Sequence, residues 1–269
     1  MPRKTIRAAL TALSLVLLSL TAATAQEESA AIEGAQLVDI LALDGEVFHV
    51  QGVDLDSRRI WITSVDRAGR KGYLHEFDRH SGALLRRLEL TDGPRYHPGG
   101  ISLHNGSIWV AVAEMTPDSS ATLMEIDTGS LRVRRRISVA DHLGCVAVAG
   151  RTLIAGNWDS RLLHIFDLAS GKPVRIVPNP FATRYQDIKL VDGQLVAGGL
   201  VTPFGGAIDW IDWPSMKLVR TARTGLTDRA RPYTGEGMTL KGRDLFLVPE
   251  DGPSRLFHFR LGDQAPDRI

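Results

Sequence analysis

A motif that recurs along the whole chain reads Tyr96-His97-Pro98-Gly99-Gly100-Ile101 in its clearest copy. Weaker copies begin at Phe48, Asp141, Thr183 and Tyr233, and each runs directly into an apolar stretch. Counted on the second residue of each copy, the intervals are 48, 45, 42 and 50 residues. A regular period in this range is typical of β-propellers, in which each repeat forms one blade. The sequence therefore predicts an all-β propeller.

Each period from residue 48 onward contains four short apolar or alternating stretches separated by turn residues, a pattern that predicts four strands per blade. The last period contains only three such stretches, the final one at residues 255–261. An isolated strand at residues 36–43 precedes the first period and has no neighbouring partner in sequence. We expect it to complete the last blade, which gives five blades and covers two open sheet edges.

The amino terminus has the pattern of a secretory signal peptide. Arg3, Lys4 and Arg7 precede an apolar run to about Leu20, and small residues follow up to Ala25. We expect residues 1–25 to be removed, residues 26–35 to form a flexible leader and residues 36–269 to form a single propeller domain in the periplasm or outside the cell.

The full chain has a formal net charge of +1, and this near-neutral balance favours neither nucleic acid nor an anionic membrane as a partner of the mature protein. Cys145 is the only cysteine, so no intrachain disulfide can form, and the residue is expected to be buried in a strand. His75, His164 and His258 lie within predicted third strands, where hydrogen-bonded strand positions are expected rather than ligand contacts.

Polar residues should gather at one mouth of the central channel, because the start of every first strand and the loop after every second strand lie on the same face of a propeller. A cavity rimmed by hydrogen-bonding and ionisable groups is the natural binding site of such a ring. The residues predicted to bind a small polar ligand there are Tyr96, His97, Asp141, His142, Asn157, Trp158, Arg161, Tyr185, Gln186, Asp187, Glu236 and Asp251.

Three histidines, His49, His97 and His142, occupy the same position in consecutive blades. Imidazoles around one axis can bind a divalent transition metal, which is the one cofactor the sequence suggests, or they can contact an organic ligand directly. The third alternative is that they hydrogen-bond neighbouring blades. Glu114 and Glu250 are the candidate catalytic acids and bases, since carboxylates gathered in one cavity can have their pKa values driven apart.

Several stretches resemble a family of uncharacterised secreted bacterial proteins that is defined as a domain of unknown function. They are Tyr96 to Ile101 with Ile108-Trp109-Val110, Asp141-His142, Asn157 to Arg161, Tyr185-Gln186-Asp187 and Pro249-Glu250-Asp251. This resemblance implies a fold but no activity.

At the level of blade pattern the chain is also similar to five-bladed glutamine cyclotransferases, in residues 48–52, in Gly235-Glu236-Gly237 and in the number of blades. Those enzymes have an acidic residue near the end of the first blade's second strand, where this chain has Thr63, Ser64 and Val65. Lactonase-type propellers, which hold a divalent cation on the axis, are similar in fold only.

These observations lead to two functional hypotheses. The first is an exported propeller that binds a small polar molecule at the channel mouth, with or without a metal, and acts on it as a hydrolase or cyclase. The second is a non-catalytic periplasmic binding protein or scaffold for a protein partner.

Overall fold

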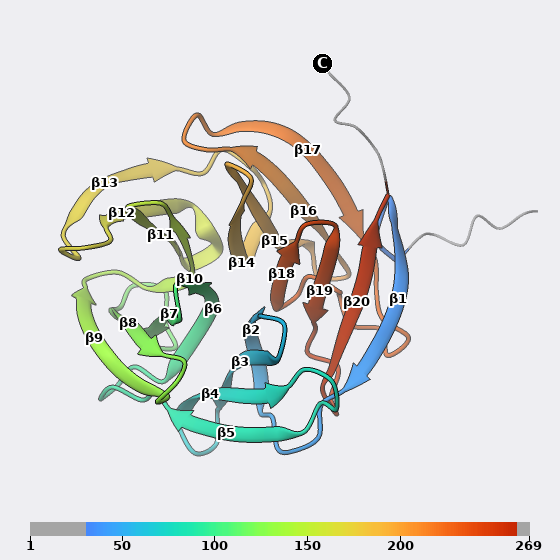
Figure 1. Cartoon of the computed structure of the whole chain (residues 1–269). Helices are drawn as coiled ribbons and strands as arrows, with labels where there is room; N and C mark the ends of the chain where they lie inside the picture. Colours follow the sequence, from blue (N-terminus) through green and yellow to red (C-terminus); the bar gives the residue numbers. More distant parts are fainter. Residues whose placement is uncertain (1–30, 263–269) are drawn as a thin grey trace, which may run out of the picture.

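Five antiparallel sheets of four strands each surround a central axis in the computed structural model, which describes residues 31–262 (Figure 1). The predicted five-bladed propeller is therefore confirmed. Blade 1 contains β2 (His49–Leu55), β3 (Arg59–Asp66), β4 (Lys71–Asp78) and β5 (Leu84–Glu89). Blade 2 contains β6 (His97–His104), β7 (Ser107–Ala113), β8 (Ala121–Asp127) and β9 (Arg132–Val139). Blade 3 contains β10 (Leu143–Ala149), β11 (Thr152–Asn157), β12 (Leu162–Asp167) and β13 (Pro173–Pro178).

Blade 4 contains β14 (Arg184–Val191), β15 (Gln194–Thr202), β16 (Gly205–Asp212) and β17 (Lys217–Thr224). Blade 5 contains β18 (Gly237–Lys241), β19 (Asp244–Val248), β20 (Arg255–Leu261) and β1 (Ala35–Ala42). The only helical element of the described residues is one 3-10 turn, η1 (Trp158–Ser160). None of the helices in this part of the chain has the length and apolar character of a membrane span.

Strand β1 closes the ring, as predicted for residues 36–43. It pairs antiparallel with β20, from Ala35 opposite Leu261 to Ala42 opposite Arg255, and the two lie side by side at the right of Figure 1. Residues 1–30, which include the predicted signal peptide and half of the predicted leader, lie outside the described residues. The rest of that leader is packed rather than free: Ile32 is fully buried, and the Glu33 amide donates to the carbonyl of Arg223.

The hydrophobic core consists of five layers, one between each pair of neighbouring blades. Blades 2 and 3, for example, enclose Trp109 and Val146, while blades 4 and 5 enclose Ile208 and Phe257. Full burial of an aliphatic or aromatic side chain stabilises a fold by about 1.5–3 kcal/mol. Because every blade contributes to two layers, the ring holds together without a disulfide, and Cys145 is buried as predicted.

Glycines of the recurring motif allow the first strands to approach one another at the axis. A Cβ atom on Gly99 would lie 1.8 Å from the carbonyl oxygen of Gly144, and one on Gly52 would lie 2.6 Å from the Cα of Gly100. No side chain fits at these positions. The motif thus marks the places where neighbouring blades touch backbone to backbone.

A β-bulge follows the opening of four first strands. The register shifts between Val50 and Gly52, between Pro98 and Ile101, between Leu143 and Cys145, and between Tyr185 and Asp187. A bulge turns the local side chains away from the alternation of a regular strand. These bulges therefore help to aim residues at the start of β2, β6, β10 and β14 toward the channel mouth.

Candidate functional site

A cavity of about 210 Å³ lies at the mouth of the channel. Most of its lining comes from the openings of the first strands, and the rest comes from the loops that follow β3 and β11. The lining residues are His49, Gln51, Arg67, His97, His142, Gly144, Asn157, Trp158, Asp159, Tyr185, Gln186 and Glu236. Residues separated by almost 190 positions in the chain thus meet in one small space, as the sequence predicted.

His97 and His142 form an aromatic wall with Trp158. The rings of His97 and His142 are 5.7 Å apart, and the edge of Trp158 meets His142 at 4.6 Å. Burial, followed by the charges of His142, His49 and Arg67, lowers the pKa of His97 to about 3. Burial also lowers the pKa of His142. Both imidazoles are therefore neutral at pH 7, and the buried Nδ1 of His97 has no hydrogen-bond partner among the described residues.

Two carboxyl groups flank His49. Its Nδ1 lies 3.0 Å from Oε2 of Glu250, and its Nε2 lies 3.5 Å from Oε1 of Glu236. Nε2 of Gln51 donates to Oε2 of Glu236 at 3.1 Å, and the Val50 amide donates to Glu250 at 2.9 Å. The three side chains form a continuous row, Glu236–His49–Glu250, whose Glu236 end lines the cavity.

The environment separates the pKa values of these two carboxyl groups. Burial, and then the negative charge of Glu250, raises the pKa of Glu236 well above its usual 4.5. Burial also opposes ionisation of Glu250, but the hydrogen bond and charge of His49 and the Val50 amide outweigh it and lower the pKa. The pKa values of the two neighbouring carboxyl groups are therefore shifted in opposite directions, an arrangement typical of acid–base sites.

Arg67 supplies a positive charge at the rim. Its side chain is exposed and lines the cavity, and it makes no hydrogen bond or ion pair with any residue between 31 and 262. Its charge acts on Glu236, Glu250 and His97. The guanidinium is free to bind a polar or anionic group of a ligand.

The turn that carries Trp158 has an unusual backbone. Asp159 and Ser160 both have positive φ values, 56° and 53°, although neither is glycine. Ser160 donates from Oγ to the carbonyl of Tyr185 at 2.8 Å, and Oδ1 of Asn157 accepts the Leu162 amide at 2.8 Å. These bonds hold the strained turn in place. Trp158 remains 37% exposed at the cavity rim.

Asp187, predicted as a ligand-binding residue, instead joins three blades at the axis. Its oxygens accept the amides of Val53, Ile188 and Met238 at 3.0, 2.9 and 3.2 Å. Nζ of Lys189 lies 2.5 Å from Oδ1. Burial raises the pKa of Asp187 to about 6, opposed by Lys189. The side chain is fully buried and does not line the cavity, so no ligand reaches it.

Five other predicted residues also lie outside the lining and have structural partners. Asp141 is hydrogen-bonded to Nε2 of His164 at 2.8 Å, and Arg161 donates hydrogen bonds to the carbonyls of Phe181 and Thr183. Asp251 forms an ion pair with Arg255, and the guanidinium of Arg70 lies over the ring of Tyr96. Glu114 accepts a hydrogen bond from the Ser120 hydroxyl. Tyr185 lines the cavity, but its hydroxyl donates to Asp209 at 2.7 Å. These contacts give each residue a structural partner in the blades and loops, and their assignment to ligand binding or catalysis stays a prediction.

The third-strand histidines behave as predicted. The ring nitrogens of His75, His164 and His258 lie within 2.8 Å of Ser64, Asp141 and Asp244 respectively. The predicted metal ligands do not form a centre: within residues 31–262 no group of three or more histidine, cysteine, aspartate or glutamate side chains is placed to hold a metal ion. The donor set of His49, His97 and His142 therefore does not fit the predicted divalent cation.

Four lining residues, Gln51, Arg67, Gly144 and Asp159, were not selected from the sequence as site residues. Gln51 lies at the bulge of β2, and its side chain donates to the Val50 carbonyl and to Glu236. Arg67 follows β3 in a loop that reaches the mouth. Their positions at the correct face were readable from the repeat, but no motif distinguished them from neighbouring polar residues.

Fold and site together define a five-bladed β-propeller with a polar cavity at one end of its axis. The chain belongs to a family of unknown function (DUF6454), whose model matches residues 42–200. No curated protein matches the sequence.

Among solved structures, the glutaminyl cyclase of Myxococcus xanthus is similar with a TM-score of 0.65 and 13% identity, over 85% of this chain and 96% of that one. BamB from Moraxella catarrhalis is similar with a TM-score of 0.44 and 14% identity, over 82% of this chain and 61% of that one. At such identities the glutaminyl cyclase supports the propeller fold alone.

Proposed function

We propose that this chain is an exported propeller that binds a small polar ligand in the axial cavity and exchanges a proton with it. The observation that carries the proposal is the geometry of Glu236, which lines the cavity, has a raised pKa and is linked through His49 to Glu250, whose pKa is lowered. Paired carboxyl groups with separated pKa values can act as general acid and general base in one reaction.

The row of side chains provides a path for the proton. Glu236 can donate its proton to a leaving group or a carbonyl oxygen, which leaves a carboxylate. That carboxylate is stabilised by the Gln51 side chain and by Arg67, whose charge already lowers the pKa of Glu236. Glu236 is then reprotonated with a proton from water: the solvent-accessible Glu250 takes it up, Nδ1 of His49 accepts it from Glu250, and Nε2 of His49 gives up its own proton to Glu236. Removal of either carboxyl group should therefore impair proton exchange.

The remaining lining suits a small ligand with a flat polar group. Trp158 offers an exposed aromatic face at the rim, and the unpartnered Nδ1 of His97 offers a hydrogen-bonding atom inside. Hydrolysis or cyclisation of an amide or ester needs this kind of proton transfer. A glutaminyl cyclase has a similar fold, so glutaminyl compounds belong among the first substrates to test.

The test is a screen of purified protein against glutaminyl peptides and against small amides, esters and lactones, with thermal shift to detect binding and mass spectrometry to detect turnover. We expect a hit whose turnover falls by about 100-fold or more in Glu236→Gln, because general acid–base groups contribute about 10²–10⁴-fold. Glu250→Gln should also reduce turnover.

Glu114→Gln is the matched control, because Glu114 is a carboxylate near the same mouth but outside the cavity lining. A substrate turned over equally by wild type and Glu236→Gln would contradict the catalytic proposal. Binding of a protein partner without any small-molecule shift or turnover would favour the non-catalytic scaffold instead.

Export is tested separately. The basic and apolar pattern of residues 1–25 supports cleavage after Ala25. Mass spectrometry of the protein from fractionated cells should give a chain that starts at Gln26 in the periplasm or medium. A full-length chain in the cytoplasm would contradict export without affecting the proposed chemistry.

A further inference from the structure

The face of the ring opposite the channel mouth carries the turns between first and second strands and between third and fourth strands. In blades 1 to 4 these two turns are joined by one backbone hydrogen bond, and in blade 5, whose fourth strand is β1, Leu261 at the end of β20 makes the matching bond. The bonds run from the amide to the carbonyl of the pairs Arg79–Arg58, Thr128–Gly106, Leu168–Arg151, Trp213–Gly193 and Leu261–Arg243. The pairs define equivalent positions, so the blades can be compared residue by residue.

Blade 1 departs from the other blades at these positions. It has arginine at both, Arg58 and Arg79, whereas blades 2 and 4 have none and blades 3 and 5 have one. The other blades form the same backbone hydrogen bond with one arginine or none at these positions. The hydrogen bond therefore does not explain why blade 1 has both Arg58 and Arg79. The second arginine in blade 1 calls for a different reason.

The two arginines border a surface pocket of about 380 Å³. Its lining consists of Ser57, Arg58, Arg59, Asp78, Arg79 and His80. Three guanidinium groups, one imidazole and one hydroxyl therefore face a single carboxylate. The donors far outnumber the acceptors in this pocket.

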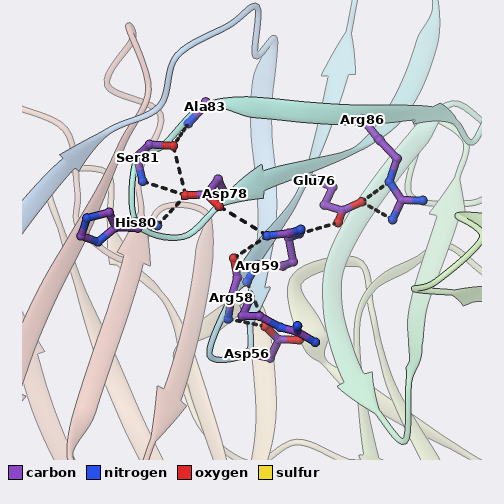
Figure 2. Close-up of polar contacts among 9 residues, drawn as sticks. All are labelled: Asp56, Arg58, Arg59, Glu76, Asp78, His80, Ser81, Ala83 and Arg86. Carbon is purple, nitrogen blue, oxygen red and sulfur yellow. Dashed lines mark hydrogen bonds and ion pairs between the residues drawn. The ribbon is translucent and has the colours of Figure 1, made fainter.

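The acids near the pocket are already engaged (Figure 2). Asp78 accepts the amides of His80 and Ser81 at 3.0 and 2.9 Å, and these bonds, with the Ser81 hydroxyl, lower its pKa. Glu76 is bridged between Arg59 and Arg86. Asp56, the remaining acid, accepts the amides of Arg58 and Arg59 at 2.7 and 2.8 Å. Neither Arg58 nor Arg79 makes an ion pair with these three carboxylates.

Arg58 and Arg79 thus keep unpaired donors beside the pocket. The guanidinium of Arg58 has no hydrogen bond or ion pair within the described part of the chain. Arg79 donates to the carbonyl of Asp56 and lies over the ring of Phe246 at 5.1 Å, which orients its planar group. Arg59 is fixed by Glu76 and Asp78. Two oriented guanidinium groups and one free group converge on one space.

We propose that this blade 1 pocket binds a tetrahedral oxyanion, a phosphate or sulfate group. Guanidinium forks match such oxyanions with paired charge-assisted hydrogen bonds. The donors that Arg58 and Arg79 leave unpaired, together with the Ser57 hydroxyl, can be met by the four oxygens of a tetrahedral ion, whereas a carboxylate has only two. The volume exceeds that of the ion, so the rest of a phosphate or sulfate ester fits as well. The site is independent of the axial cavity.

The test is calorimetric titration of the whole protein with inorganic phosphate and with sulfate, and with acetate for comparison. We expect saturable binding of phosphate or sulfate that exceeds binding of acetate. Binding should weaken by about tenfold or more in Arg58→Ala and in Arg79→Leu, since a hydrogen bond to a charged group contributes about 1.5–3 kcal/mol. Leucine is the residue that blade 3 carries at the position of Arg79, so the turn should tolerate it.

Two controls locate the ion. Arg151→Ala removes the equivalent arginine of blade 3, and Arg67→Ala removes the free cation of the axial cavity; both should bind phosphate as the wild type does. Nε–H resonances of Arg59 and Arg79 should shift on titration, a readout that needs no variant. The proposal would be overturned if the wild type showed no saturable binding of phosphate or sulfate, or if it bound acetate as strongly as phosphate. It would also be overturned if Arg151→Ala weakened phosphate binding as much as Arg58→Ala does, or if only Arg67→Ala weakened it.

Discussion

Two buried carboxyl groups on the propeller axis, Asp187 and Glu236, differ in how their oxygens are used. Asp187 accepts three backbone amides and the Lys189 ammonium, and it has no access to the cavity. Glu236 accepts one hydrogen bond, from Gln51, and faces the cavity with 13% of its side chain exposed. Burial raises the pKa of both. A raised pKa alone therefore does not identify a functional acid. The carboxyl group must also face a cavity and have hydrogen-bonding capacity that the protein leaves unused.

The largest expected difference between these residues is in stability. Asp187→Ala leaves the buried Lys189 without its partner and frees three amides, so the free energy of unfolding should fall by about 3–5 kcal/mol. Glu236→Gln replaces one neutral group by another of the same shape and should change it by about 1 kcal/mol or less. Urea unfolding of both variants measures this. Equal losses would mean that Glu236 is a structural residue like Asp187.

A smaller effect is expected in the pH dependence of stability. The folded-state pKa of His97 is about 3, below the ordinary 6.5, so the unfolded chain binds more protons between these values. Stability from this group is complete above pH 6.5 and is lost as the pH falls toward 3. Between pH 6.5 and 5.5, wild type should lose about 1 kcal/mol more than His97→Asn. Asp187, whose pKa is raised, changes the pH dependence of stability in the opposite direction. It does so equally in the wild type and in His97→Asn, so its effect cancels when the two proteins are compared.

That pH experiment uses denaturant unfolding at each pH. Parallel curves for wild type and His97→Asn would show that the His97 imidazole is not held neutral by the cavity. His75, whose pKa burial lowers to about 4, is the matched control. It is buried in blade 1 away from the cavity, so its replacement should give the same pH effect without changing ligand binding.

The smallest effect concerns a carboxylate at a turn between strands, Asp167, of which one oxygen is hydrogen-bonded. Asp167 accepts the amide and hydroxyl of Ser170 at 2.8 and 2.7 Å, and these bonds lower its pKa. Ser170→Ala should reduce stability by about 0.5–1 kcal/mol. It should also bring the pKa of Asp167 closer to the ordinary value, as measured by carboxyl NMR. An unchanged pKa would mean that the turn, unlike the axis, does not tune its carboxylate through hydrogen bonds.

The fold was predictable from sequence because its signals are repeated. Three features of the sequence each indicate the ring: the Gly99-Gly100 motif, the regular repeat period and the unpaired strand at residues 36–43. In the structure the glycines lie where blades touch, the repeats form blades, and the strand pairs with β20. The location of the site followed from the same repeat, since equivalent positions of different blades must meet at one face. His49, His97, His142 and Glu236 were found in this way.

The roles of individual residues were less predictable, because they depend on partners from other blades. Asp187 is occupied by amides of Val53 and Met238, which no local pattern indicates. Glu250 and Asp251 are adjacent, yet the first contacts His49 while the second pairs with Arg255 outside the cavity. Bulges change which side chains face the axis, and the sequence does not mark their positions.

The central claim is that the pKa of Glu236 is raised well above 4.5 because the group is buried beside the negative charge of Glu250. Carboxyl ¹³C NMR of the labelled protein, with Glu236→Gln to assign the signal, measures this pKa directly. The account predicts a midpoint well above 4.5 for Glu236, and a lower midpoint in Glu250→Gln because the neighbouring negative charge is gone. A midpoint at or below 4.5 in the wild type would contradict it.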